Sequence, residues 1–207
     1  MSKLLHIQSS PRGDRSASIE VATHFIKTYQ AANSSDTLET FDHWEASLPE
    51  FDREMIDARY AVLQGQSPTP EQSAAWEAVV KITNHFKSAD KILLSLPMWN
   101  FSIPYKLKHY IDLLAQPELT FSFTPEEGYK GLVIGKPLAV IYARGGAYSL
   151  GSGAESYDQQ SVYIKQIFAF VGFTDIREIF VEPTLSSTKE ETVKAAKLVA
   201  AKIASKF

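Results

Sequence analysis

The chain has 207 residues, of which 44% are hydrophobic and 22% are charged. These values are typical of a globular domain, and no apolar run approaches the roughly 18 residues that a membrane-spanning helix needs. The formal net charge is -3 with no basic block, so nucleic acid is not an expected partner. Because the chain has no cysteine, it can form no disulfide, thiolate metal site or iron–sulfur cluster, and any redox chemistry requires a bound cofactor.

The length suits one α/β domain with insertions, which we expect to span residues 1–207. The N-terminal segment is too short, and too broken by His6, for a secretory signal, so we expect a soluble, cytoplasmic protein. None of the five histidines stands four residues from another, and we therefore expect no metal site.

The first half of the chain alternates between short apolar runs and amphipathic segments. An apolar run at 4–7 predicts a strand that ends in a turn-forming loop, and a helix follows with Ser16 or Ser18 at its N-cap. Residues 37–42 are half polar and suit an edge strand. A charged helix is expected over 53–64, and a second helix over about 75–86.

The second half continues the alternation. The run at 91–96 is typical of a strand buried on both faces, and a helix over 103–114 follows it. Residues 119–133 alternate around a Pro-Glu-Glu-Gly turn, which indicates a hairpin excursion outside the main sheet. Strands at 138–143 and 176–181 flank a helix at about 157–171, and Thr188 begins a capping box that opens the final helix.

Five strands that alternate with helices predict a three-layer α/β fold with a parallel sheet. Of the Rossmann and flavodoxin-like orders, five strands in about 200 residues favour the flavodoxin-like order 2-1-3-4-5. In that order strands 1, 3 and 4 are neighbours, so the loops after them should converge on one ligand.

The loop after the first strand is rich in serine. Hydroxyl groups and unpaired main-chain N–H groups at a helix N-terminus suit a phosphate monoester. The chain has neither of the glycine-rich patterns that bind a pyrophosphate or a triphosphate. Taken alone, the loop is also compatible with an ordinary helix cap.

The loops after strands 3 and 4 carry different chemistry. Asn100 lies between Trp99 and Phe101, a combination that could hold the polar edge and the faces of a flat heteroaromatic ring, although a buried aromatic turn would look the same. Gly145 and Gly146 would allow a ligand to approach the main chain closely, and Arg144 could place charge near its edge.

Together these motifs resemble those of the FMN-dependent NADH-azoreductases and NAD(P)H:quinone oxidoreductases. The resemblance rests on S-S-x(5)-S-x-S at 9–18, P-M-W-N-F at 97–101, x-L-K-x-Y-x-D at 106–112 and A-R-G-G at 143–146. It extends through essentially the whole chain. Two departures stand out, namely the additional Pro11, Arg12 and Arg15 in the first loop and Ala143 where a hydroxyl residue is frequent.

The resemblance implies an FMN-binding homodimer in which NADH delivers hydride to flavin N5 and a quinone or azo compound then takes two electrons from the same place. It requires no catalytic side chain, because the cofactor carries the chemistry. The residues that it assigns to the cofactor are Ser10, Ser16, Ala17 (through its backbone), Ser18, Met98, Trp99, Asn100, Phe101, Ala143, Arg144, Gly145 and Gly146.

Several alternatives stay open from the sequence. Phe121, Phe123 and Tyr129 are either core aromatics or a wall on which a flat substrate stacks. His6 is expected in the core and His109 at the surface. A flavodoxin-type electron carrier would share the fold, although such carriers are usually smaller and more acidic, and a nucleotide-binding regulatory module without redox activity is a third possibility.

Overall fold

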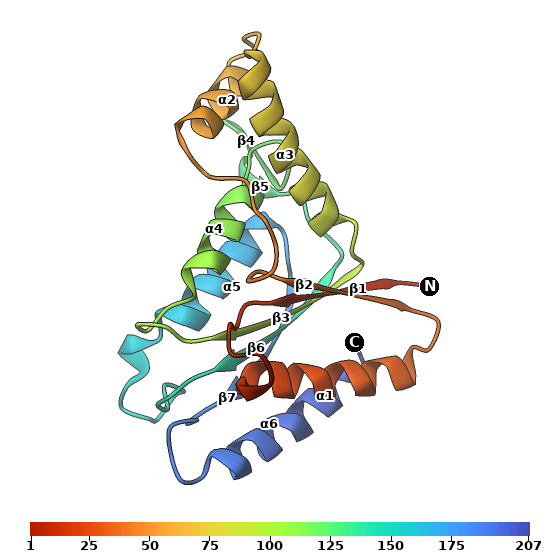
Figure 1. Ribbon diagram of the computed structural model, residues 1–207, viewed down its shortest axis with the longest axis vertical. Helices are drawn as coiled ribbons and strands as arrows, with labels where there is room; N and C mark the ends of the chain where they lie inside the picture. Colours follow the sequence, from red (N-terminus) through yellow and green to blue (C-terminus); the bar gives the residue numbers. More distant parts are fainter.

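A parallel sheet of five strands forms the centre of the protein in the computed structural model, which describes residues 1–207 (Figure 1). The strands are β1 (Lys3–Gln8), β2 (Thr37–Asp42), β3 (Lys91–Pro97), β6 (Pro137–Ala143) and β7 (Asp175–Val181). Their spatial order is β2-β1-β3-β6-β7. The loops after the three central strands β1, β3 and β6 therefore open at the same edge of the sheet.

Two further strands, β4 (Phe121–Thr124) and β5 (Gly128–Gly131), pair only with each other, in an antiparallel hairpin. The predicted flavodoxin-like fold with five parallel strands is confirmed. The predicted order 2-1-3-4-5 needs correction to 2-1-3-6-7, because the hairpin strands take the fourth and fifth places in the chain without joining the main sheet.

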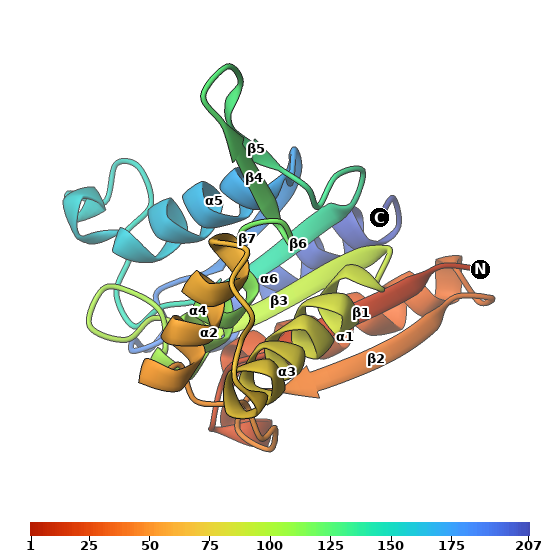
Figure 2. The same ribbon diagram turned by 90° about the horizontal axis from the view of Figure 1, so that it is seen from above.

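Helices cover both faces of the sheet (Figures 1 and 2). One face carries α1 (Ala17–Ala32) and α6 (Lys189–Ala204). The other carries α3 (Pro70–Lys87), α4 (Tyr105–Leu114) and α5 (Gln159–Val171), and α2 (Arg53–Leu63) packs on α3. Two short 3-10 helices, η1 (Gly13–Arg15) and η2 (Glu155–Tyr157), precede α1 and α5.

The central strands supply side chains to two separate cores, one on each face of the sheet. In β3, Ile92 and Leu94 pack under α3, α4 and α5, whereas Leu93 packs under α1 and α6. In β6, Val140 packs in the core under α3, α4 and α5, and Ile141 packs in the core under α1 and α6. Because successive strand residues point to opposite faces, a strand covered on both sides needs the continuous apolar runs seen in the sequence.

Helix ends are fixed by local hydrogen bonds, although not always where the sequence indicated. Ser16 is the N-cap of α1, and Thr69 forms a capping box with Gln72 at the start of α3. Thr188 precedes α6, but its side chain makes no capping bond and instead lies 2.9 Å from the Ser186 hydroxyl. The predicted capping box at α6 is therefore wrong.

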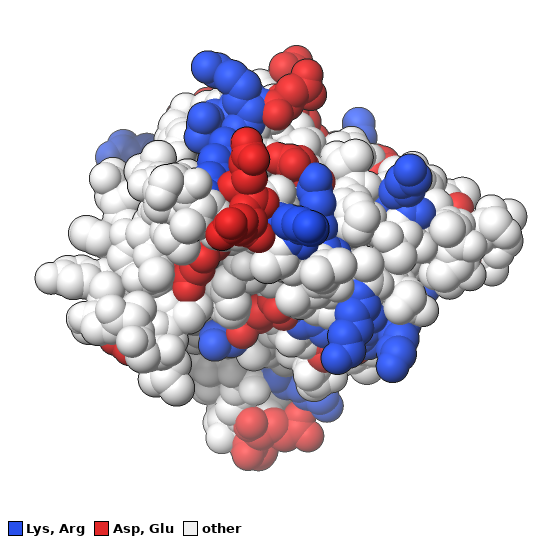
Figure 3. Space-filling view, turned by 90° about the horizontal axis from the view of Figure 1, so that it is seen from below, with Lys and Arg blue, Asp and Glu red and all other residues white.

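Charged side chains are distributed unevenly over the face that carries α1 and α6 (Figure 3). Lysine and arginine alternate there with aspartate and glutamate, and few charges appear at the left end of the view, the side toward which the strands point. None of the helices combines the length and the hydropathy that a bilayer crossing requires.

Candidate functional site

Main-chain hydrogen bonds tie together the loops at the carboxyl edge of the sheet. The N–H group of Ser9 donates to the carbonyl of Ser95 at 2.9 Å, and that of Met98 donates to the carbonyl of Ala143 at 2.8 Å. These bonds join the end of β1 to β3 and the end of β3 to β6. The structure thus brings the three sequence-predicted loops together.

The serine loop presents its donors at the N-terminus of α1. Ser10, Ser16 and Ser18 are buried, and the hydroxyl groups of Ser16 and Ser18 lie 3.0 Å apart. The main-chain N–H groups of Ser10, Ala17 and Ser18 donate no hydrogen bond within the chain. A set of free N–H groups and hydroxyls at the positive end of a helix dipole fits the chemistry of a phosphate group.

Two residues that sequence reasoning missed support this loop from the end of β2. The Nδ1 atom of His43 lies 2.7 Å from the Ser9 hydroxyl, and the indole N–H of Trp44 donates to the Ser9 carbonyl at 3.2 Å. Burial lowers the pKa of His43 to about 3, with smaller contributions from the charges of Lys106 and His109. His43 is therefore neutral near pH 7, and only its place directly after the second strand could have pointed to it.

The loop after β3 holds a tight turn with an unusual backbone. Trp99 and Ser102 exchange two main-chain hydrogen bonds of 3.0 and 2.9 Å, and the residues between them, Asn100 and Phe101, have φ of 46° and 68°. Left-handed backbone costs about 1–3 kcal/mol for a non-glycine residue and is concentrated at functional sites. The ring of Phe101 stacks on Tyr157 at 4.9 Å, and the main-chain N–H groups of the two turn residues have no partner in the chain.

The side chain of Arg144 is buried in ion pairs, whereas the sequence suggested that its charge lies at the edge of a ligand. Its guanidinium is fully buried and donates to Asp158 at 2.9 Å, Glu182 at 3.2 Å and Gln160 at 3.0 Å. Burial tends to raise the pKa of Asp158, but hydrogen bonds from Ser161 and the charge of Arg144 together hold it below its ordinary value. Only the main chain at residue 144 is left to face a ligand.

Gly145 and Gly146 have ordinary negative or extended backbone, so positive φ is not their role. A Cβ on Gly145 would lie 2.8 Å from a methyl group of Leu185, and one on Gly146 would lie 3.2 Å from the ring of Tyr148. Their main-chain N–H groups make no hydrogen bond within the chain. A side chain at either position would have to displace Leu185 or Tyr148, and the two glycines leave two donors free at the end of β6.

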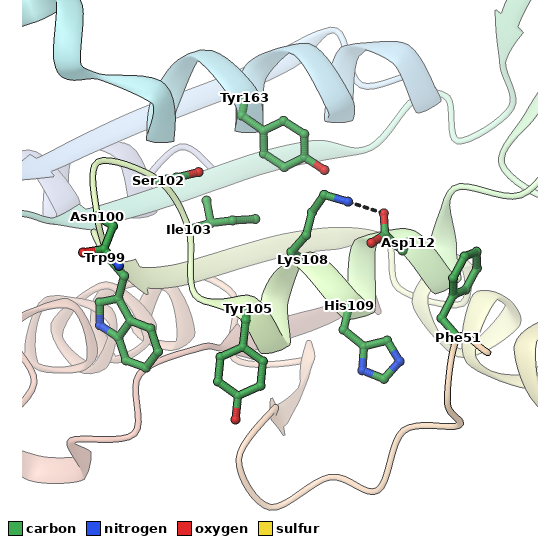
Figure 4. A pocket seen from close by; sticks show the side chains of 10 residues that line it. All are labelled: Phe51, Trp99, Asn100, Ser102, Ile103, Tyr105, Lys108, His109, Asp112 and Tyr163. Carbon is green, nitrogen blue, oxygen red and sulfur yellow. Dashed lines mark hydrogen bonds and ion pairs between the residues drawn. The ribbon is translucent and has the colours of Figure 1, made fainter.

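A hollow of about 720 Å³ lies beside the Trp99 loop, along the outer side of α4 (Figure 4). It is lined by Phe51, Trp99, Asn100, Ser102, Ile103, Tyr105, Lys108, His109, Asp112 and Tyr163. His109, expected at the surface, is half-buried, and its Nε2 atom lies 2.9 Å from the carbonyl of Pro49. The hollow therefore continues from the crevice edge toward the segment after β2.

The hairpin aromatics do not line this hollow. Phe121 is buried and packs on Phe170 of α5 at 4.8 Å between ring centres, and Tyr129 packs on the same ring at 5.5 Å. The base of the hairpin is fixed at the C-terminal end of α5, where Gly131 has no room for a side chain. Within one chain these rings therefore form no wall at the crevice, although Phe123 and Tyr129 are largely exposed.

The sheet order and the three converging loops define a protein of the flavodoxin-like class. The chain matches the flavodoxin-like fold family over residues 2–203 and belongs to it. It is 48% identical over 206 residues to an FMN-dependent NADH:quinone oxidoreductase of Desulfotalea psychrophila, with 99% of this chain and 97% of the relative covered. A protein of the same description from Nitratidesulfovibrio vulgaris is 50% identical over 186 residues, covering 90% of this chain and 88% of the relative.

Two solved structures are similar over the whole chain. The azoreductase of Bacillus anthracis str. Sterne has a TM-score of 0.92 at 32% identity, with 100% of both chains covered. An FMN-dependent NADH-azoreductase of Bacillus anthracis str. Ames Ancestor, solved in complex with FMN, has a TM-score of 0.90 at 30% identity, covering 100% of this chain and 99% of that one.

Proposed function

We propose that this protein is an FMN-dependent NADH:quinone oxidoreductase that also reduces azo compounds. The observation that carries the proposal is the meeting of three loops at one sheet edge, with free main-chain donors on all three and aromatic rings on the second. The names and the near-complete coverage of the relatives support the same activity.

The phosphate of FMN would lie at the N-terminus of α1. Ser10, Ser16 and Ser18 would hold it through their hydroxyls, and Ala17 through its main-chain N–H. This assignment rests on the free N–H groups in the loop and on the favourable sign of the helix dipole. The loop offers one terminal phosphate site, which suits FMN better than a dinucleotide such as FAD.

The ring system would lie between the loops after β3 and β6. Met98, Trp99, Asn100 and Phe101 would line one side, and the main chain of residues 143–146 would face the other edge. The N–H groups of Asn100 and Phe101, which have no partner in the chain, would donate to polar ring atoms. Arg144 would act indirectly, by fixing the loop through its buried ion pairs.

When bound, FMN supplies the redox chemistry, accepting hydride from NADH and passing two electrons to the acceptor. The task of the protein is to orient the rings, and the crevice needs no nucleophile or fixed proton donor because water can supply protons. We place this activity in the cytoplasm, because NADH is an intracellular reductant.

The protein would work as a homodimer in which a second copy completes each site. Phe123 and Tyr129 support this proposal, since they are 55% and 67% exposed on a hairpin that does not reach its own crevice. They would be the rings available to stack on a flat substrate in the partner subunit. Sedimentation of the purified protein tests the dimer, and a monomer at micromolar concentration would contradict it.

The cofactor and the activity can be tested together. Heat release followed by chromatography should identify FMN in the purified protein, and recovery of FAD would contradict the assignment. The protein should then oxidise NADH in the presence of a quinone through many turnovers. Flavin reduction without quinone turnover would indicate an electron carrier, and a colourless protein that binds no FMN would overturn the proposal.

A further inference from the structure

A groove runs along the outer side of α4, from the Trp99 loop to the segment after β2. It consists of two hollows, of about 720 and 510 Å³, which share Phe51, Tyr105 and His109. The first hollow begins at the Trp99 loop, beside the proposed position of the flavin ring (Figure 4). The second ends against residues 46–50. The groove therefore connects the proposed reaction site with a separate part of the surface.

Lys106 is a cation in the second hollow that no carboxylate neutralises. Its ammonium group forms no ion pair and lies 4.8 Å from the centre of the Trp44 ring. Lys108, two residues further along α4, is by contrast paired with Asp112 at 2.5 Å. The charge of Lys106 is thus available to a ligand.

His43 lines the same hollow as Lys106. Burial is the main cause that lowers the pKa of His43, and the charge of Lys106 lowers it further. Glu50 is the one carboxylate that lines the second hollow, and it is exposed and forms no ion pair. The end of the groove near Lys106 therefore favours an anionic group.

Aromatic rings accompany this charge. Trp44 lies 5.8 Å from Trp99 and 5.7 Å from Tyr105, measured between ring centres, and Tyr105 is 64% exposed. Such rings can support a flat base by stacking, as they do in sites for single-stranded nucleic acids. An anion next to a flat heteroaromatic base is the chemistry of an adenine nucleotide.

We propose that this groove binds the ADP half of NADH, with the diphosphate at Lys106 and the adenine against Tyr105. The proposal rests on the proposed function, since it places the nicotinamide at the Trp99 end of the groove. Diphosphate recognition by one side-chain charge explains why the chain needs no glycine-rich dinucleotide motif. It also makes Lys106 a residue that selects the electron donor.

An electron donor without the ADP half isolates the contribution of Lys106 to NADH binding. We would compare the KM for NADH with the KM for dihydronicotinamide riboside, which lacks the ADP half, in wild-type holoenzyme and in Lys106→Gln. The KM for NADH should rise about tenfold, the factor for loss of one charge-assisted hydrogen bond, whereas the KM for the riboside should not change. Lys106→Arg should restore most of the NADH affinity. Lys165→Gln, which removes an equal charge from an exposed site on α5, should behave as wild type.

Calorimetric titration of the holoenzyme with ADP-ribose supplies a readout that does not depend on turnover. Wild type and Lys106→Arg should bind ADP-ribose, and Lys106→Gln should bind it about tenfold more weakly. Equal binding by all variants, or an equal effect of Lys106→Gln on both electron donors, would overturn the proposal. A wild type that binds ADP-ribose but reduces no quinone would instead contradict the proposed function and leave the groove assignment standing.

Discussion

The guanidinium of Arg144 is enclosed in the protein, with Asp158 at 2.9 Å and Glu182 at 3.2 Å. Both carboxylates are themselves largely buried, so removing the cation would leave two negative charges in a poorly solvated place. Loss of one partner from a buried ion pair is costly for this reason, even where the intact pair contributes little.

We therefore expect Arg144→Met to lower the free energy of unfolding by about 3–5 kcal/mol. Arg177→Met serves as the matched control, because Arg177 forms an ion pair with Asp175 at a partly exposed site and should lose less than about 1 kcal/mol. Urea unfolding of both variants measures the difference. Equal losses would show that the buried pairs of Arg144 contribute no more than a surface pair.

Ser18 offers a cleaner test of the phosphate loop than Ser16, whose hydroxyl also caps α1. If Ser18 donates to the phosphate, Ser18→Ala should weaken FMN binding by about 1.5–3 kcal/mol, the value for a hydrogen bond to a charged group. Thr23→Ala on the same helix, where the hydroxyl bonds only to the Ile19 carbonyl, should bind FMN as wild type does. Fluorescence titration of the apoprotein with FMN gives both affinities, and unchanged binding by Ser18→Ala would place the phosphate elsewhere.

For single residues, the sequence predicted the loop in which a residue lies better than it predicted the partners of its side chain. It placed Arg144 in the correct loop, but the partners that turn its side chain inward lie 14 and 38 residues away. His43 escaped notice because its contact with Ser9 forms only when β1 and β2 pair. Long-range pairing of this kind leaves no local pattern in a single sequence.

Helices and strands were predictable where a local hydrophobic pattern or a turn motif determines them. The continuous apolar run of β3 and the alternation around the turn of the β4–β5 hairpin each reflect a constraint within a few residues. The position of the hairpin relative to the crevice was not predictable. That position depends on the docking of Gly131 against Gly172 at the end of α5, a contact between residues far apart in the sequence.

Thr69 and Thr188 each precede a helix, but only Thr69 caps it, and they therefore make a matched pair. Thr69→Ala should lower the free energy of unfolding by about 1 kcal/mol, because Thr69 accepts from the Gln72 N–H in a complete capping box. Thr188→Ala should change it by less than half of that, because the Thr188 hydroxyl bonds only to Ser186. Urea unfolding of both variants measures these changes. A larger decrease in the free energy of unfolding for Thr188→Ala would support the capping box that the sequence indicated.

For the whole molecule, buried histidines link stability to pH. His6 is buried in β1 as predicted, with its Nε2 atom 2.9 Å from the Ser95 hydroxyl, and burial lowers its pKa from 6.5 to about 4. Below pH 6.5 His6 binds a proton in the unfolded chain but not in the folded chain. The free energy of unfolding therefore decreases as the pH falls from 6.5 to 4. His43 acts in the same direction.

His6 alone should lower the free energy of unfolding by about 3 kcal/mol between neutral pH and pH 4. His6→Gln should therefore show a shallower fall in the free energy of unfolding over this range, whatever its stability at pH 7. Between pH 9 and pH 8 the two proteins should have the same slope, since His6 is neutral in both states there. Parallel curves down to pH 4 would contradict the assignment of a neutral buried histidine.

The central claim is that one crevice serves both NADH and the acceptor in turn, through FMN. Initial rates with NADH varied at several fixed quinone concentrations test it most directly. If the donor must leave before the acceptor stacks in the same place, double-reciprocal plots should give parallel lines, and planar aromatic inhibitors should compete with both substrates. Lines that intersect would show that NADH and quinone are bound together, and the two substrates would then not share one face of the flavin.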